Sequence, residues 1–242
     1  MIQIGITERG DAALDTSWKQ WVMEGHQAIL ITKNARKLFE GLYEDKKLNL
    51  INPKNIIVHA TVTGYAGTDL EPNVPKPDWR SINNAKEILG LADLVLRVDP
   101  IIPTEEGTKI ACDVIDNFNN NKLNSRVRIS FIDNYYHIRD RGVKLPWTSL
   151  HAPLEMRKES YNKILKVCTK YDYSLEVCGE PSFECKGCIS KRDLQSFNID
   201  YKNIEFPKNY QRGACACLGI KHELLNNKHP CAHKCKYCYW KD

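Results

Sequence analysis

The sequence contains no long hydrophobic run. Its 242 residues include no apolar stretch that approaches the ~18 residues of a membrane-spanning helix. Its first residues also lack the basic segment and the apolar stretch of a secretory signal peptide. We therefore expect a protein without membrane contact that is located in the cytoplasm, where disulfide bonds are not expected.

A strong excess of charge of one sign is also missing. The formal net charge is +5, which is too small by itself to argue for a nucleic-acid partner. The excess is concentrated in residues 202–242, where lysine and arginine outnumber acids eight to three. A phosphate-bearing substrate or a nucleic acid would suit this region. So would an anionic thiolate-ligated cluster whose charge the nearby cations compensate, and we favour the cluster because it needs no further partner.

Cysteine, in contrast, is abundant, with ten residues. In a reducing compartment this number indicates metal binding rather than disulfides. The rest of the composition is that of a globular protein, with 42% hydrophobic and 27% charged residues. The length is sufficient for one domain with its own core, and we expect a single domain over residues 1–242.

Short apolar runs rich in β-branched residues alternate with amphipathic stretches up to Cys178. The strand candidates are Ile2–Thr7, Gln27–Lys33, Asn55–Thr63, Asp93–Asp99, Arg126–Ile132 and Ser174–Cys178. The helix candidates are Thr16–Glu24, Ala35–Leu42, Trp79–Leu89 followed by Gly90 as a helix end, Thr108–Asn119 and Leu154–Thr169. This alternation predicts an α/β fold with a parallel sheet. Six β/α units suit a partial or closed parallel barrel, with its functional site at the carboxyl ends of the strands.

The character of the sequence changes after Cys178. Periodicity fades in residues 179–242, where Cys, Lys, Gly and Asn dominate. The segment is long for a loop without secondary structure, and its few apolar side chains would not offset the chain entropy. We therefore predict a β/α barrel over residues 1–178 and a cysteine-rich metal-binding tail over residues 179–242, whose order depends on bound metal.

Three cysteines late in this tail form a C-x3-C-x2-C triplet: Cys231, Cys235 and Cys238. Soft thiolates favour iron–sulfur clusters, zinc or Cu(I). Three thiolates this close in sequence can hold three irons of a [4Fe–4S] cluster and leave the fourth iron open to a cofactor. Zinc is the alternative, since a structural zinc site takes four N or S ligands and His229 or His233 would complete the set.

The other cysteines of the tail form a second group. The four expected ligands are Cys178, Cys188, Cys215 and Cys217, and Cys185 is the reserve candidate. Four thiolates would complete a second [4Fe–4S] cluster or a zinc site. Cys112 and Cys168 lie in helical patterns, and we interpret them as small core residues.

Polar side chains gather where the predicted strands end. They are Glu8, Arg9, Asp11, Thr63, Tyr65, Arg97, Asp99, Ser130 and Asp133. The carboxyl ends of barrel strands meet at one mouth, so these side chains are candidates for contacts with a bound cofactor or substrate. Burial of Arg97 is costly unless the guanidinium is paired, either with a ligand carboxylate or with an aspartate of the protein.

With these residues in view, the chain resembles domain-of-unknown-function family 1848, whose members carry a radical-SAM-type cysteine triplet at the C-terminus. The matching segments are Arg9–Asp11, Thr61–Tyr65, Glu71–Pro75, Arg97–Ile101, Ile129–Asp133, Cys178–Glu180, Cys188–Ile189, Gln211–Cys217 and Cys231–Tyr239. One segment departs from the family pattern: a Ser-x-Asp-Ile-Gly stretch is usual before the triplet, whereas this sequence has Ile220-Lys-His-Glu-Leu-Leu.

The resemblance implies a permuted radical-SAM-like enzyme, because most radical SAM enzymes carry the triplet after the first strand. It implies a [4Fe–4S] cluster on Cys231, Cys235 and Cys238 whose open iron binds S-adenosylmethionine (SAM). Reductive cleavage of SAM would then give a 5'-deoxyadenosyl radical. Tyr237 would lie beside the adenine, and the polar strand-end residues would contact SAM or the substrate. An electron donor such as flavodoxin or ferredoxin is implied, whereas the substrate and the catalytic residues are not.

The alternative function is a nucleic-acid-binding module. Zinc or iron–sulfur sites would then order the basic tail without any radical chemistry. Such a module would not need six β/α units with polar strand ends, so these features favour the enzyme.

Overall fold

The structure is a computed structural model that describes residues 2–118, 125–206, 208–209, 213–225 and 231–239. The predicted helix end at Asn119, the possible zinc ligand His229 and the start of the Gln211–Cys217 segment lie outside these residues.

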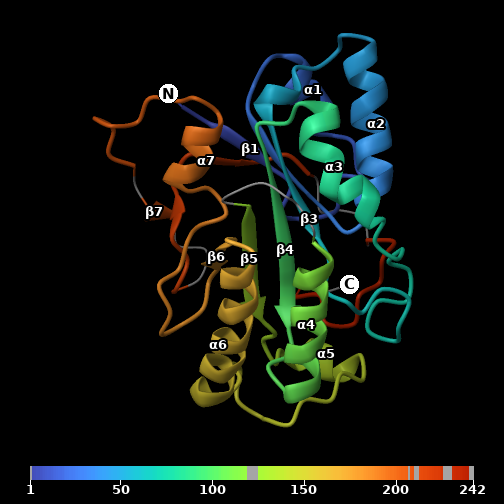
Figure 1. Ribbon diagram of the computed structural model, residues 1–242, viewed down its shortest axis with the longest axis vertical. Helices are drawn as coiled ribbons and strands as arrows, with labels where there is room; N and C mark the ends of the chain where they lie inside the picture. Colours follow the sequence, from blue (N-terminus) through green and yellow to red (C-terminus); the bar gives the residue numbers. More distant parts are fainter. Residues whose placement is uncertain (1, 119–124, 207, 210–212, 226–230, 240–242) are drawn as a thin grey trace.

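A seven-stranded sheet in the order β6-β5-β4-β3-β2-β1-β9 forms the centre of the protein (Figure 1). Its strands are β1 Ile4–Ile6, β2 Ala28–Thr32, β3 Ile56–Thr61, β4 Asp93–Ile101, β5 Arg126–Phe131, β6 Ser174–Val177 and β9 Lys221–Glu223. Every neighbouring pair is parallel. The α/β fold and the six predicted strands are confirmed. The seventh strand, β9, comes from the tail and pairs with β1.

The strands β2, β3 and β5 are buried along their whole length, as expected for a parallel sheet that is covered on both faces. Five helices overlap the predicted ones: α1 Lys19–Met23, α2 Ala35–Lys47, α3 Trp79–Leu89, α4 Glu105–Asn117 and α6 Leu154–Lys170. Three short helices were not predicted: the 3-10 helix η1 Pro53–Asn55, α5 Tyr136–Asp140 and α7 Lys191–Ser196.

Helix α3 shows why the ends fall where they do. The Asp78 side chain accepts a hydrogen bond from the Ser81 amide at the N-terminus, and Gly90 has a left-handed φ of 77° at the C-terminus. Helix α2 extends past the predicted end at Leu42, because Glu44, Lys46 and Lys47 are good helix formers although the segment lacks an apolar periodicity. No helix among the described residues is long and apolar enough to cross a membrane.

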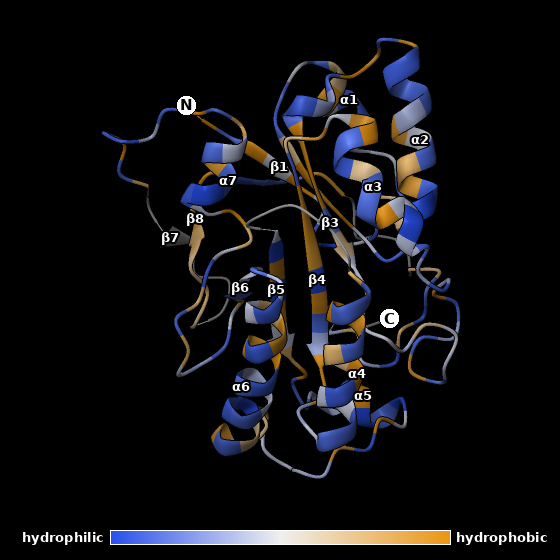
Figure 2. Ribbon diagram, in the orientation of Figure 1, coloured by the Kyte–Doolittle hydropathy of each residue, from blue (hydrophilic) through white to orange (hydrophobic). Residues whose placement is uncertain are grey.

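Helices α2, α3, α4 and α6 pack on one face of the sheet, which we call the outer face. Their buried residues, such as Leu38, Ile82 and Ile164, form one core with alternate side chains of the strands. Figure 2 shows part of β4 coloured as hydrophobic, and these helices with a mixture of hydrophobic and hydrophilic residues. Strands β1 to β6 follow one another in sequence order, so the sheet lacks the reversal of strand order found in a doubly wound fold. Strands β6 and β9 do not pair in the described residues, so barrel closure is not confirmed.

The tail covers the opposite face, which we call the inner face. Ile189, Leu194 and Phe197 from the tail form a second core with Ile6 and Ile57 of the sheet. The sequence pattern indicated no particular helix or strand in the tail. The tail contains α7, the two-stranded pair β7 Lys208–Asn209 and β8 Cys217–Leu218, and β9. Its apolar residues are sparse along the sequence but converge on one face, where they bury enough surface to pack as a layer.

The inner face also holds a buried network of charges. Arg126 donates to Glu176 at 2.9 Å and to Asp193 of α7 at 2.7 Å. Arg128 donates to the same Glu176 carboxylate at 2.6 Å. Buried charges are tolerated only when they are paired and hydrogen-bonded. These ion pairs therefore contribute to fixing the position of α7 against β5 and β6.

Candidate metal and cofactor site

The cysteine triplet lies against the carboxyl ends of β1, β2 and β3. His233, between the first two cysteines of the triplet, has its Nε2 at 2.8 Å from Asp11 Oδ2. The Lys236 amide donates to the Leu70 carbonyl at 3.0 Å, and Asn73 donates to the Ala232 carbonyl at 2.9 Å. These contacts hold the triplet loop against the turn after β1 and the loop after β3.

Asp11 is the centre of the contact with β1. Its carboxylate accepts from the Thr32 hydroxyl at 2.6 Å, from the Lys33 amide at 2.7 Å and from the Ala13 amide at 2.8 Å. Burial opposes ionisation of this carboxyl, but the His233 contact and these hydrogen bonds lower its pKa below the ordinary value. Asp11 is thus a structural anchor that joins β1, β2 and the triplet loop.

Tyr237 is the second anchor of the loop. Its hydroxyl contacts the Glu71 carboxylate and lies 2.7 Å from Lys33 Nζ, which in turn lies 2.8 Å from Glu71. Both Tyr237 and Glu71 are buried. Lys33, Glu71 and Thr63 line a cavity of about 230 Å³ between the ends of β2 and β3 and the loop that follows β3. This cavity is therefore connected to the triplet loop through Lys33 and Glu71, which line the cavity and contact Tyr237.

The three thiols of the triplet lie close enough to influence each other's ionisation. Burial raises the pKa of Cys235 to about 12, and the Lys33 ammonium opposes this shift. The charges of Cys231 and Cys238 raise the Cys235 pKa further. Arg141 donates to the Cys238 carbonyl at 2.7 Å and fixes the third position. Among the described residues the triplet does not meet the spacing of ligands around one ion. Thiolates on different irons of a cluster lie farther apart than ligands of a single ion.

His233 does not point toward the thiols. Its Nε2 is held by Asp11 at 2.8 Å and its Nδ1 faces the Asn73 carbonyl at 3.4 Å. A zinc ligand would need one of these nitrogens free. His233 therefore does not complete a Cys₃His zinc set in this arrangement.

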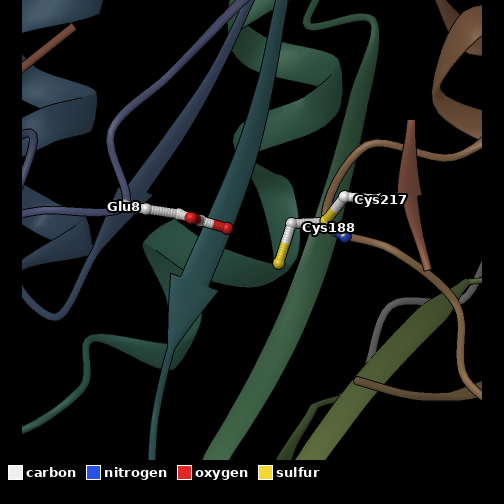
Figure 3. A group of neighbouring side chains, drawn as sticks. All are labelled: Glu8, Cys188 and Cys217. Carbon is white, nitrogen blue, oxygen red and sulfur yellow. Dashed lines mark hydrogen bonds between the residues drawn. The ribbon is translucent and has the colours of Figure 1, made fainter. Parts of the chain in front are cut away.

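The second cysteine group lies under the inner face of the sheet. Cys178 Sγ, just after β6, lies 3.5 Å from Cys188 Sγ. The Cys188 amide donates to Cys217 Sγ at 3.0 Å. Cys188, Cys217 and the Glu8 carboxylate, just after β1, offer ligand atoms that all lie within 4.8 Å of one another. Figure 3 shows Glu8 and Cys188 pointing toward one another, with Cys217 beside Cys188.

Cations surround this second group. Hydrogen bonds with the Cys178 and Cys217 thiols, together with the charges of Arg97 and Arg128, hold the pKa of Cys188 well below its ordinary value. Burial raises the pKa of Glu8 to about 7, as does the charge on Cys188, whereas the contact with Lys221 of β9 opposes that shift. A thiolate flanked by positive charge is the species that binds soft metals.

Cys185 and Cys215 lie at the border of a larger cavity. Cys185 Sγ contacts the backbone of Glu180, accepting from its amide at 3.1 Å. The cavity measures about 730 Å³ and is also lined by Asp133, His151 and Glu180. The His151 imidazole lies 2.7 Å from the Asp133 carboxylate. This cavity therefore combines two acids, a histidine and two thiols at the ends of β5 and β6.

Arg97 is paired inside the protein. Its Nε donates to Asp99 Oδ2 at 2.6 Å, and Ser130 contacts the other oxygen of the same carboxylate. The Arg97 charge also faces Cys188, Cys178 and Glu8. Arg97 thus connects the Asp99 pair to the second cysteine group, and its predicted contact with a ligand carboxylate remains a prediction.

Three predicted site residues remain: Arg9, Thr63 and Tyr65. Arg9 is exposed, and Thr63 is buried and accepts a hydrogen bond from the Tyr65 amide at 3.2 Å. Tyr65 is itself buried, and burial, followed by the charge of Glu106, raises the pKa of its phenol to about 12. The phenol therefore stays neutral.

Several residues that contact the predicted site residues were not themselves predicted. Sequence reasoning assigned no site role to Lys33, Lys221, His151 and Glu180. Lys33 ends the second predicted strand, so the strand-end criterion would have found it. Lys221 and His151 lie outside any strand end that the pattern indicated, and only the fold brings them to these positions.

A comparison with curated proteins found no match. The model of the domain of unknown function DUF1848 matches residues 21–240. This match covers most of the chain and includes both cysteine groups, and it agrees with the resemblance noted in the sequence. The chain therefore belongs to the DUF1848 family.

Proposed function

We propose that this protein is a radical SAM enzyme whose [4Fe–4S] cluster is held by Cys231, Cys235 and Cys238. The observation that carries the proposal is the position of the triplet. Three mutually interacting thiols are held at the carboxyl ends of parallel strands, in a loop that contacts the cavity-lining residues Lys33 and Glu71. The carboxyl ends of the strands are where β/α folds place their ligands.

The residues around the triplet fit such a group. The donor set is three soft thiols, and the only described histidine of the loop, His233, is held by Asp11 and Asn73. Three thiolates without a fourth protein ligand leave one iron open for a cofactor. Lys33 supplies a positive charge that favours the ionised thiolates and the anionic cluster.

With the cluster and SAM bound, the pair would supply a 5'-deoxyadenosyl radical that removes a hydrogen atom from the substrate. The residues of the chain would orient SAM. Tyr237, Lys33 and Glu71 form one hydrogen-bonded group beside the cavity of about 230 Å³. In this proposal Glu71 and Lys33 face the polar groups of SAM by charge-assisted hydrogen bonds.

The cavity of about 730 Å³ at the ends of β5 and β6 is the proposed substrate site. Asp133, paired with His151, and Glu180 give it a polar lining at the same end of the sheet as the triplet. A reductant of the flavodoxin or ferredoxin type would deliver the electron. The nucleic-acid alternative is less well supported, since Lys221 pairs with Glu8 and Lys236 pairs with Asp69, which removes two cations from the basic tail.

The test is SAM cleavage by anaerobically reconstituted protein with dithionite, with 5'-deoxyadenosine as the measured product. Cys235→Ala should abolish cleavage and most of the brown absorbance of the cluster. Cys112→Ala, which changes a thiol of α4 outside both groups, is the matched control and should cleave SAM as the parent does. Colourless protein that binds zinc at the triplet, or normal turnover by Cys235→Ala, would contradict the proposal.

A further inference from the structure

A group of candidate metal ligands lies apart from the triplet. It combines the end of β1, the end of β6 and two loops of the tail. Glu8, Cys188 and Cys217 place their ligand atoms within 4.8 Å of one another, and Cys178 Sγ lies 3.5 Å from Cys188 Sγ (Figure 3). Cys188 and Cys217 are 4% and 2% exposed, so the group is shielded from bulk solvent.

The spacing suits one ion better than a cluster. Two thiolates at about 2.3 Å from a tetrahedral zinc lie about 3.8 Å apart. The separation of 3.5 Å between Cys178 and Cys188 is close to that value. Each thiolate of a [4Fe–4S] cluster ligates a different iron, so the thiolates of a cluster lie farther apart than these two do. The pair is also too far apart to be a disulfide, whose sulfurs lie about 2.05 Å apart.

The fourth ligand is a carboxylate rather than a fourth thiolate. Glu8 offers its carboxylate within 4.8 Å of the Cys188 and Cys217 thiols. Cys178 joins this group through its 3.5 Å contact with Cys188, whereas Cys215 lines the larger cavity. Lys221 contacts one oxygen of Glu8, so it holds the carboxylate in place from the side of β9. Such a contact to a ligating carboxylate is the usual outer-sphere support of a metal site.

A buried histidine gives an independent sign that this region binds a polar ligand. His59 on β3 is fully buried, and neither ring nitrogen has a hydrogen-bond partner among the described residues. Ile57 faces the inner core, so His59, two residues later, faces it too. The His59 ring lies within electrostatic reach of Cys188 and Arg128. Buried polar groups without partners mark the places where a water molecule or an ion is bound.

We propose that Cys178, Cys188, Cys217 and Glu8 bind one divalent zinc-class ion in a Cys₃Glu set. Binding forms three metal–sulfur bonds and one metal–oxygen bond. The protons of those thiols that are not already ionised pass to the solvent, and no electron is transferred. The cations Arg97, Arg128 and Lys221 compensate the net negative charge that three thiolates and a carboxylate give to the ion.

The position of the ion explains what it would do. Glu8 follows β1 and Cys178 follows β6, and five strand pairings separate these two strands in the sheet. Cys188 and Cys217 belong to the tail that covers the inner face. One ion would thus connect both ends of the six-strand array with the tail across the inner face. We assign it a structural role that is independent of the triplet.

The experiment uses the full chain with Cys231, Cys235 and Cys238 changed to Ala, kept reduced, so that the triplet cannot bind metal. Titration with Co(II) should saturate at one bound equivalent. The absorption spectrum should then show thiolate charge-transfer bands and the visible bands of a tetrahedral site. X-ray absorption of the zinc form should give three sulfur neighbours and one oxygen or nitrogen neighbour. Four sulfur neighbours, or iron with acid-labile sulfide in place of zinc in anaerobically purified protein, would overturn the proposal.

Variants identify the ligands. Glu8→Gln should weaken Co(II) binding by more than the roughly 10-fold that loss of an outer-sphere partner costs. Cys215→Ser and His59→Gln should change the affinity by less than that factor. If Cys215→Ser or His59→Gln weakens binding more than Glu8→Gln does, the assignment of Glu8 as the fourth ligand is wrong. Cys188→Ser should abolish binding, and the absorption spectrum of the parent decides the ligand set if this variant does not fold. The triplet is absent throughout, so the outcome does not depend on radical SAM activity.

Discussion

His233 Nε2 lies 2.8 Å from Asp11 Oδ2, although the two residues are 222 positions apart in the sequence. Asp11 also accepts from Thr32 and from the Lys33 amide, so one buried carboxylate connects the first two strands to the triplet loop. Contacts within the protein therefore hold the triplet loop against the first two strands. Five predictions follow from this arrangement and from the other buried contacts.

Asp11→Asn should loosen the triplet loop. An amide keeps the size of the side chain but presents one acceptor oxygen where the carboxylate presents two, so at least one buried donor is left unpaired. We expect a loss of about 1–3 kcal/mol in the free energy of unfolding and faster hydrogen exchange in residues 231–239. Asp15→Asn is the control, because within the described part of the chain the Asp15 side chain bonds only Ser17, at the surface. Unchanged exchange in the loop would show that Asp11 does not hold it.

Lys33→Met should destabilise the protein by leaving Glu71 buried with one contact fewer. Lys33 is 18% exposed and Glu71 is 1% exposed. We expect a cost of about 3 kcal/mol, the lower end of the range for breaking a buried pair. Adding Glu71→Gln to Lys33→Met should recover part of the lost free energy of unfolding. A double-mutant cycle by urea unfolding measures the coupling, and additive effects of the two changes would exclude the ion pair as the cause.

Asp193→Asn should detach α7 from the sheet. Asp193 is fully buried, accepts from Arg126 at 2.7 Å and caps α7 through Ser190. Removing its charge leaves Arg126 with fewer partners, so we expect a loss of about 3–5 kcal/mol in the free energy of unfolding. Asp200→Asn changes an exposed aspartate of the same tail and should cost less than about 0.5 kcal/mol. Equal melting temperatures for the two variants would contradict this prediction.

Asp93 should contribute to the loss of stability in acid. Burial opposes its ionisation, but Lys86 at 2.6 Å and Arg126 at 3.2 Å hold its folded-state pKa below the ordinary value of 3.8. A lowered folded-state pKa means that the contribution is present above pH 3.8 and is lost as the pH falls through the lower folded-state pKa.

The measurement is the urea midpoint of the parent and of Asp93→Asn at several pH values. The difference between the two proteins should be constant at neutral pH and should shrink below pH 3.8. Subtraction removes the contributions of the other buried acids, which both proteins share. A difference that does not change with pH would mean that the Asp93 charge does not contribute to stability.

Gly187→Ala should force two loops of the tail apart. A Cβ at Gly187 would lie 2.4 Å from Cys217 Cα and 2.6 Å from the Ala216 carbonyl oxygen, and both are backbone atoms that cannot turn aside. We expect a loss of about 1–3 kcal/mol from overpacking. Gly213→Ala is the matched control, since nothing lies within 4 Å of its Cβ position. Thermal unfolding of both variants tests the prediction, and equal melting temperatures would contradict it.

Much of the fold could be predicted because it depends on local patterns. The buried strands β2 and β3 appear in the sequence as continuous apolar runs, and the ends of α3 follow from Asp78 and Gly90. The short strand β9 could not be found in this way. Its residues Lys221–Glu223 are polar, and they form a strand only because the exposed edge of β1 offers them backbone hydrogen bonds.

The candidate site also has one part that the sequence predicts and another that depends on the tertiary structure. The sequence by itself determined the triplet, because the spacing of Cys231, Cys235 and Cys238 is a local property of the chain. It also indicated a second thiol group, but it included Cys215, whereas the thiols that lie close together are Cys178, Cys188 and Cys217. Only the tertiary structure decided that Glu8 meets Cys188 and Cys217, and that Arg97 pairs with Asp99. These contacts depend on how the sheet twists and how the tail packs across it, and no local pattern encodes the distance between residues so far apart in the chain.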